Sequence, residues 1–125
     1  MTKSYTEITA DINRGIGKMR AGAPETMAAF SALAKGAMKA GGLSSQLKEL
    51  IALAIGVAGH CDGCIGFHAK ALARAATPRE HVIEALAVAV YMGGGPSVMY
   101  AADAMNAFDE FQSGAARQES TASVA

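Results

Sequence analysis

The sequence predicts an all-α protein, a single-domain helical bundle of about six helices. Apolar residues recur every three or four positions along most of the chain, which is the period of an amphipathic helix. Alanine accounts for 28 of the 125 residues and aromatic residues for only 6%, so helices can approach closely through small side chains. Clusters of glycine and proline divide the chain into segments of helical length, and this length fits one domain.

The N-terminal third predicts two helices separated by a short break. The first spans residues 5–20, and its apolar face carries Ile8, Ile12, Ile16 and Met19. Pro24 suits the first position of the second helix, because its missing amide would have no helical partner there. The pair Gly41-Gly42 ends that helix.

Two further helices are predicted on either side of a short turn. Ser44 or Ser45 can cap the third helix, because a serine hydroxyl accepts a hydrogen bond from a free amide of the first turn. This helix runs to about Gly59, and its predicted inward stripe carries Leu47, Leu50, Ile51, Ala54 and Ile55. Residues 60–63 form the turn, and residues 64–76 form the fourth helix.

A capping box is predicted at the start of the fifth helix. The Thr77 hydroxyl and the Glu80 carboxylate have the required spacing, and Pro78 suits the first helical position. The helix spans residues 78–92. Within it, residues 86–90 resemble a buried strand, but the capping box and the length favour a helix.

The last glycine cluster, residues 93–95, and the proline after it separate the fifth helix from a sixth over residues 97–111. The remaining residues, 113–125, are small, polar and aperiodic. We therefore expect one helical domain over residues 1–112 and a flexible C-terminal tail over residues 113–125.

Charge and hydropathy argue against several classes of function. The 11 basic and 11 acidic residues cancel and form no basic cluster, so neither nucleic acid nor a membrane is an expected partner. The N-terminus lacks the pattern of a signal peptide, and the longest apolar runs are shorter than the ~18 residues of a membrane span. We expect a cytoplasmic protein, where closely spaced cysteines favour redox chemistry or metal binding over a structural disulfide.

The candidate site lies between Glu49 and His68 and contains both cysteines of the chain, Cys61 and Cys64. If a helix begins near Cys61, helical periodicity places both thiols and the His68 imidazole on one face. Cysteines about one turn apart lie within disulfide reach, so the pair can cycle between dithiol and disulfide. The free amides of the helix N-terminus and a neighbouring imidazole would both favour a thiolate.

The neighbouring titratable residues have distinct candidate roles. His68 lies four residues after Cys64, where helical side chains meet, so it can take the proton of that thiol. Glu49, on the preceding helix, can orient His68 and stabilise its charged form. His60 and Asp62 flank the first cysteine and can tune it electrostatically. The plainer alternatives are buried cysteines, a structural histidine and a surface carboxylate.

A zinc site is the runner-up interpretation, because Cys61, Cys64 and His68 with His60 or Glu49 offer up to four ligands. Structural zinc sites usually draw ligand pairs from separated segments, whereas three of these residues are close in sequence, so we expect no metal. The sequence carries no haem, flavin or nicotinamide motif, and we expect no cofactor. A third interpretation is a protein that only assembles or binds a small ligand, with vestigial thiols.

These residues resemble the AhpD-like branch of the carboxymuconolactone decarboxylase family. The similarity rests on Glu49, Cys61-Asp62-Gly63-Cys64 and His68, with Leu43-Ser44 and the KELIALA run, and is close over residues 43–76. Members of that branch often carry a histidine immediately before the second cysteine, where this chain has Gly63. The CxxC pair resembles the peroxidase branch rather than the decarboxylase branch.

The resemblance implies a thiol-dependent peroxidase or disulfide reductase with Glu49, Cys61, Cys64 and His68 as its catalytic residues. In this reading Cys64, activated by His68 and Glu49, reduces a hydroperoxide, and Cys61 then closes a disulfide. A dithiol reductant, either a lipoamide-bearing or a thioredoxin-like protein, would restore the thiols.

Assembly is the last expectation from the sequence. Residues 50–59 and 85–95 are apolar on more than one side, and so small a core cannot bury all of that surface. The resemblance to small members of the family implies a closed, ring-like assembly. We therefore expect a homo-oligomer, a trimer or hexamer rather than a dimer.

Overall fold

Six helices account for nearly all of the residues that the computed structural model describes, which are residues 3–124, with side chains described for residues 3–114. In chain order they are α1 (Tyr5–Gly22), α2 (Pro24–Met38), α3 (Ser45–Ala58), α4 (Asp62–Arg74), α5 (Arg79–Gly93) and α6 (Gly95–Val124). The described residues contain no strand, so the predicted all-α fold is confirmed. None of these helices is long and apolar enough to cross a membrane.

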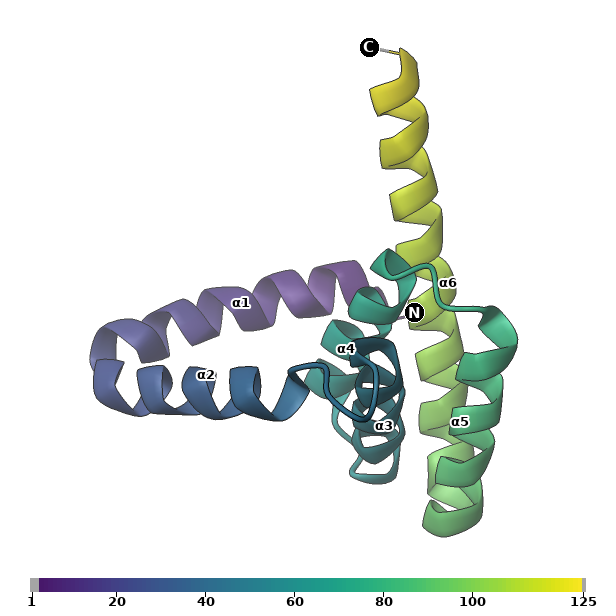
Figure 1. Cartoon of the computed structure of the whole chain (residues 1–125), viewed down its shortest axis with the longest axis horizontal. Helices are drawn as coiled ribbons and strands as arrows, with labels where there is room; N and C mark the ends of the chain where they lie inside the picture. The colour runs from purple at the N-terminus through teal and green to yellow at the C-terminus, as the bar shows by residue number, and fades with distance from the viewer. Residues whose placement is uncertain (1–2, 125) are drawn as a thin grey trace.

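The core lies where α3, α4, α5 and α6 pack together (Figure 1). Helix α4 contacts both α3 and α6, and α5 closes the bundle against α3 and α6. The largest apolar side chains that are fully enclosed come from all of these helices and include Leu53, Val57, Ile65, Leu72, Val82 and Phe108. Several core positions are alanines, which lets the helices pack closely.

The face of α3 that turns inward differs from the predicted stripe. Leu50, Leu53 and Val57 are buried, whereas Leu47, Ile51 and Ile55 are exposed. The predicted stripe followed the helical spacing of apolar residues and was right for Leu50, but α4 packs against the neighbouring face. On that face Gly56 lets the two helices approach closely. The large aliphatic side chains are therefore left on the surface of this single chain.

Helices α1 and α2 form an antiparallel hairpin that projects from the bundle, drawn in purple and blue in Figure 1. Only the first turns of α1 are tied down, and there Tyr5 and Thr9 are buried. Helix α2 buries none of its side chains, and Phe30 and Leu33 are 64% and 65% exposed. The hairpin is thus an amphipathic arm whose apolar face this chain does not cover.

The first turn of α1 is capped by a carboxylate of α6. Glu110 of α6 accepts hydrogen bonds from the backbone amides of Tyr5 and Thr6 and from the Ser4 hydroxyl. These amides are the donors that a helix N-terminus leaves free, and a negative charge there also suits the helix dipole. Burial would raise the pKa of Glu110, but these hydrogen bonds hold it below its ordinary value.

Helix starts follow the predictions at two places and depart from them at a third. Ser44 caps α3 through a hydrogen bond from the Leu47 amide, and Pro24 occupies the first turn of α2. The predicted capping box is wrong. Thr77 is buried, its hydroxyl has no partner among the described residues, and Pro78 is the N-cap of α5. The Thr77 amide instead donates to Leu72, so this residue completes the end of α4.

The ends of α3 and α4 share one hydrogen-bond pattern. The amide of Cys61 donates to Gly56 and that of Thr77 to Leu72, which places His60 and Ala76 in the left-handed conformation with φ of 55° and 52°. Glycine usually occupies such positions, because a Cβ there is strained. Each turn therefore holds a non-glycine residue in a backbone conformation that its side chain disfavours.

The last helix is longer than predicted. Helix α6 begins at Gly95 and continues to Val124, past the expected end near residue 111, and Figure 1 shows it rising beyond the bundle. Its first part packs against α4 and α5. The division at residue 112 is therefore not a helix boundary, while the flexibility of residues 113–125 stays a prediction.

Candidate functional site

The two cysteines form a disulfide at the start of α4. Cys61 is the N-cap of this helix, and its Sγ accepts a hydrogen bond from the Cys64 amide at 3.1 Å. The two Cα atoms lie 5.3 Å apart, within the range that a disulfide tolerates. A sulfur at an N-cap lies beside free backbone amides, which would stabilise a thiolate once the bond is reduced.

Glu49 and His68 are hydrogen-bonded across the α3–α4 interface. Glu49 Oε2 lies 2.6 Å from His68 Nδ1, and the two side chains are 20% and 30% exposed. An ionised Glu49 can only accept, so the imidazole donates from Nδ1, and its Nε2 is left to accept a proton. His68 lies one turn beyond Cys64 on α4. The sequence reasoning thus placed these two residues together correctly.

Close approach of α3 to α4 brings Glu49 within reach of His68. Gly56 faces Cys64, and a Cβ at this position would lie only 2.8 Å from the Cys64 Cβ. Any larger residue would force the helices apart. The sequence reasoning missed this role, although a glycine inside the apolar run of α3 was a signal that it could have used.

His60 and Asp62, the two residues that flank Cys61, contact other parts of the chain. The His60 ring stacks on the Tyr100 ring of α6, with centroids 4.7 Å apart and planes within 5° of parallel. Asp62 accepts hydrogen bonds from the Tyr5 hydroxyl at 2.8 Å and from Lys3 at 3.1 Å. Among the described residues, the hydrogen bonds and ring contacts of His60 and Asp62 do not involve the Glu49–His68 pair.

The sequence reasoning did not identify the partners on this flank, which are Lys3, Tyr5, Tyr100 and Asp103. Lys3 also binds Asp103 of α6 at 2.8 Å and lies 5.3 Å from the centroid of the Tyr100 ring. The hydrogen bond that Lys3 donates to Asp103 is the main cause that raises the pKa of Lys3, so the ammonium stays charged. No local spacing links residues 3, 62 and 103, so only the fold brings them together.

Helix α1 lies against Gly63, the position at which this chain departs from the AhpD-like pattern described above. A Cβ at Gly63 would lie 3.0 Å from Ile12 Cδ1, and one at Gly66 would lie 2.5 Å from Thr9 Cγ2. These two glycines let α1 pack against α4. A larger residue at position 63 would have to move the Ile12 side chain, which now lies against this glycine.

A metal centre gains no support from the arrangement. Among the described side chains, no three or more histidine, cysteine, aspartate or glutamate residues are grouped to hold a metal ion. The cysteines are joined to each other, and His68 is paired with Glu49. The four ligands of the zinc interpretation are therefore not gathered around one point.

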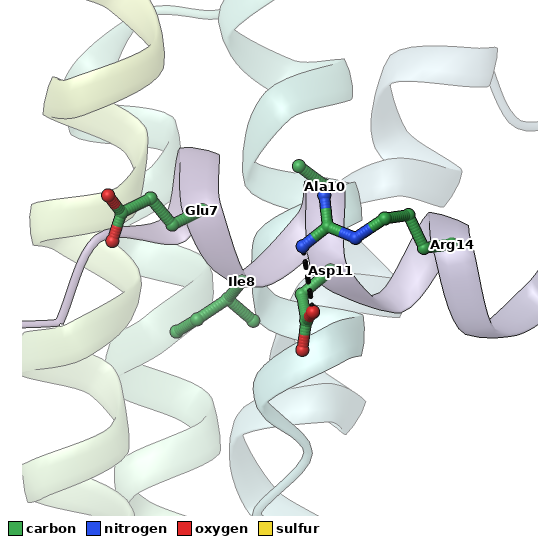
Figure 2. Close-up of a pocket in the computed structure, with 5 residues that line it drawn as sticks. All are labelled: Glu7, Ile8, Ala10, Asp11 and Arg14. Atoms are coloured by element: carbon green, nitrogen blue, oxygen red, sulfur yellow. Dashed lines mark hydrogen bonds and ion pairs between the residues drawn. The ribbon is translucent and has the colours of Figure 1, made fainter.

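Two surface hollows of about 480 Å³ lie away from the cysteines. One runs along the exposed side of α1, and Figure 2 shows Arg14 reaching back to Asp11 there, an ion pair of 2.8 Å. The other lies between α3 and α5 and is mostly apolar, with Leu47, Ile51, Ala54 and Val88 among its lining residues. The exposed α3 side chains Leu47 and Ile51 therefore form part of the wall of this second hollow.

Comparison with known proteins gives one consistent result. A model of the carboxymuconolactone decarboxylase family matches residues 24–107. An uncharacterised protein of Cupriavidus necator is 39% identical over 109 residues, which cover 87% of this chain and 96% of that protein. An uncharacterised protein of the cox locus of Paracoccus denitrificans is 36% identical over 82 residues, or 66% of this chain and 74% of that protein.

A solved structure gives the same result at the level of the fold. The crystal structure of an apo carboxymuconolactone decarboxylase family protein from Legionella pneumophila matches with a TM-score of 0.85 and 51% sequence identity. The match covers 86% of this chain and 96% of that chain. The likeness therefore extends to nearly the whole of both chains.

Proposed function

This chain belongs to the carboxymuconolactone decarboxylase family, and we propose that it acts there as an AhpD-like thiol-dependent peroxidase or disulfide reductase in the cytoplasm. One observation carries the proposal. The Cys61–Cys64 disulfide lies at the N-terminus of α4, and His68, which is hydrogen-bonded to Glu49 of α3, lies one turn further along α4. A redox couple, a base and a group that orients the base are thereby adjacent.

The proposed cycle starts with both cysteines reduced. His68 accepts the Cys64 proton at Nε2, because the hydrogen bond to Glu49 keeps the other ring proton on Nδ1. The Cys64 thiolate attacks the terminal oxygen of the hydroperoxide, and the O–O bond breaks. The leaving alkoxide takes the proton from His68 and departs as an alcohol, or as water when the substrate is hydrogen peroxide. Cys64 is then a sulfenic acid.

The disulfide forms in the second step. The Cys61 sulfur attacks the Cys64 sulfur, the S–O bond breaks, and the hydroxide leaves as water with the Cys61 proton. The cysteine pair has then given two electrons and two protons to the peroxide. A dithiol donor, either a lipoamide-bearing or a thioredoxin-like protein, reduces the disulfide by thiol–disulfide exchange and is itself oxidised to a disulfide.

A thiol count tests this proposal. One equivalent of hydroperoxide added to the reduced protein should consume both thiols and yield one alcohol, and a dithiol should restore them. Cys61→Ser and Cys64→Ser should each abolish turnover, because neither can close the disulfide. Protein alkylated before the peroxide is added serves as the control. Peroxide consumption at the wild-type rate by the double variant would overturn the proposal, and stoichiometric zinc in the reduced protein would favour the runner-up.

We also propose that the protein is a homo-oligomer, a trimer or hexamer. Its support is the apolar surface of a single chain, on α2 and along the α3–α5 hollow. Leu33→Gln should weaken assembly, whereas Ser31→Gln on the same exposed helix should not. Light scattering that returned a folded, active monomer of 12.7 kDa for the wild type would contradict this proposal.

A further inference from the structure

A polar cluster on the α1 side of α4 has no part in the cycle above. Asp62, the first residue of α4, accepts hydrogen bonds from the Tyr5 hydroxyl at 2.8 Å and from Lys3 at 3.1 Å and 3.4 Å. Lys3 is in turn held by Asp103 of α6 at 2.8 Å. Residues far apart in the sequence are therefore gathered around one carboxylate beside the redox pair.

Asp62 and a thiolate compete for the same helix end. Asp62 directly follows Cys61, whose sulfur caps α4. The free amides of this turn favour one negative charge. A second charge nearby opposes the first by repulsion, which would raise the pKa of the thiol. An unrestrained Asp62 would thus work against the thiolate on which the proposed chemistry depends.

We propose that Lys3 and Tyr5 are positioning residues for the redox pair, which hold the Asp62 carboxylate on the α1 side of α4, where the Lys3 ammonium offsets its charge. The helix N-terminus is then left to the thiolate. This inference deepens the proposed dithiol cycle and rests on it for its biological meaning. It concerns the titration of the thiol itself, however, which can be measured without a peroxide.

The protonation states of the cluster fit this role. Tyr5 is only 1% exposed, and burial together with its hydrogen bond to Asp62 raises the pKa of Tyr5 far above its ordinary value, so its hydroxyl stays a neutral donor. Burial would also raise the pKa of Asp62, but the bonds from Tyr5 and Lys3 lower it overall. The carboxylate is therefore ionised at neutral pH and requires these partners.

The other titratable groups near this helix end act on different atoms. Asp103 of α6 accepts a hydrogen bond from Lys3. His60, in the turn before α4, stacks on Tyr100 of α6. On the opposite side, His68 is paired with Glu49. The described contacts to the Asp62 carboxylate come from Lys3 and Tyr5. Removing the Tyr5 hydroxyl changes this carboxylate alone, whereas removing the Lys3 ammonium also releases Asp103.

The test is the pH dependence of iodoacetamide labelling of the reduced protein. Lys3→Met and Tyr5→Phe should each raise the pKa of the reactive thiol by about half a pH unit, and Asp62→Asn should lower it by a similar amount. Arg79→Met, which removes the exposed ion pair with Asp109 at a distance from the site, is the matched control and should leave the pKa unchanged.

Double variants separate positioning from general destabilisation. In an Asp62→Asn background, Tyr5→Phe should no longer shift the thiol pKa, because the charge that it positions is absent, and Lys3→Met should shift it only through the unpaired Asp103. If Tyr5→Phe does not fold, the Lys3 and Asp62 variants still decide the matter. A thiol pKa unchanged by Lys3→Met, or raised by Asp62→Asn, would overturn the inference. Failure of the peroxidase proposal would give a different result, in which the thiols titrate as expected but do not reduce peroxide.

Discussion

Gly56 offers the sharpest test of how the site is built, because one methyl group there should separate α3 from α4. A Cβ would lie 2.8 Å from the Cys64 Cβ and 3.6 Å from the Ile65 amide nitrogen. Carbon atoms in contact prefer about 3.5 to 4.0 Å, so the helices must separate by about 1 Å. Overpacking of this kind costs ~3 kcal/mol at the upper end of its range, and the better helix propensity of alanine returns ~1 kcal/mol.

Gly56→Ala should therefore lower the free energy of unfolding by ~2 kcal/mol, or the Tm by about 8 °C at fixed protein concentration. It should also slow thiol alkylation at neutral pH, because Glu49 and His68 are hydrogen-bonded across the same interface. The matched control is Gly36→Ala on α2, where a Cβ would meet nothing within 4 Å. This variant should be stabilised by about 0.5 to 1 kcal/mol. A Gly56→Ala protein as stable as Gly36→Ala, with unchanged labelling, would refute this reasoning.

Three further predictions address the base, the helix ends and the acid response. Glu49→Gln and His68→Ala should each slow iodoacetamide labelling at pH 7, because general-base assistance is worth ~10² to 10⁴ in rate, and an unchanged pH profile would assign both residues a structural role. His60→Gly and Ala76→Gly should each raise the free energy of unfolding in urea by about 1 kcal/mol, because glycine relieves the left-handed strain. His60→Gly should gain less because it loses the ring stack on Tyr100, and equal gains would mean that the stack contributes nothing. Glu110 has a depressed pKa in the folded protein, so its contribution is present above the unfolded pKa and is lost as pH falls through the folded value. Glu110→Gln should therefore flatten the loss of stability between pH 5 and pH 3, and an unaltered acid transition would contradict this.

Local patterns predicted the parts of the structure that depend on local geometry. The helical spacing of Cys61, Cys64 and His68 fixed which residues share a face of α4, and it did so without knowledge of the fold. The pairing of Glu49 with His68 needed one more step, the packing of two consecutive helices joined by a short turn. Such neighbours in sequence usually pack against each other, so the resemblance to a known family and the physical argument agreed.

The features that sequence reasoning missed all depend on tertiary contacts. Lys3 and Tyr5 reach Asp62 across more than fifty positions, and nothing in their own segments indicates a partner. The capping box at Thr77 failed because the end of α4 draws this residue into the core before α5 begins. The apolar stripe of α3 was assigned from helical spacing, whereas the close approach at Gly56 favours the face that carries Leu53 and Val57.

The wide separation in sequence between the anchors of α1 has a consequence for the order of folding. The contacts that build the redox site are local, three positions between the cysteines and 19 between Glu49 and His68. The bonds that hold α1 join Tyr5 to Asp62 and Ser4 to Glu110, across 57 and 106 positions. Local contacts form quickly, whereas closing long loops is slow. We therefore expect α3 and α4 to form the redox site while the N-terminal helix is still undocked. During that interval the two cysteines are open to oxidants without the cluster that later surrounds Asp62.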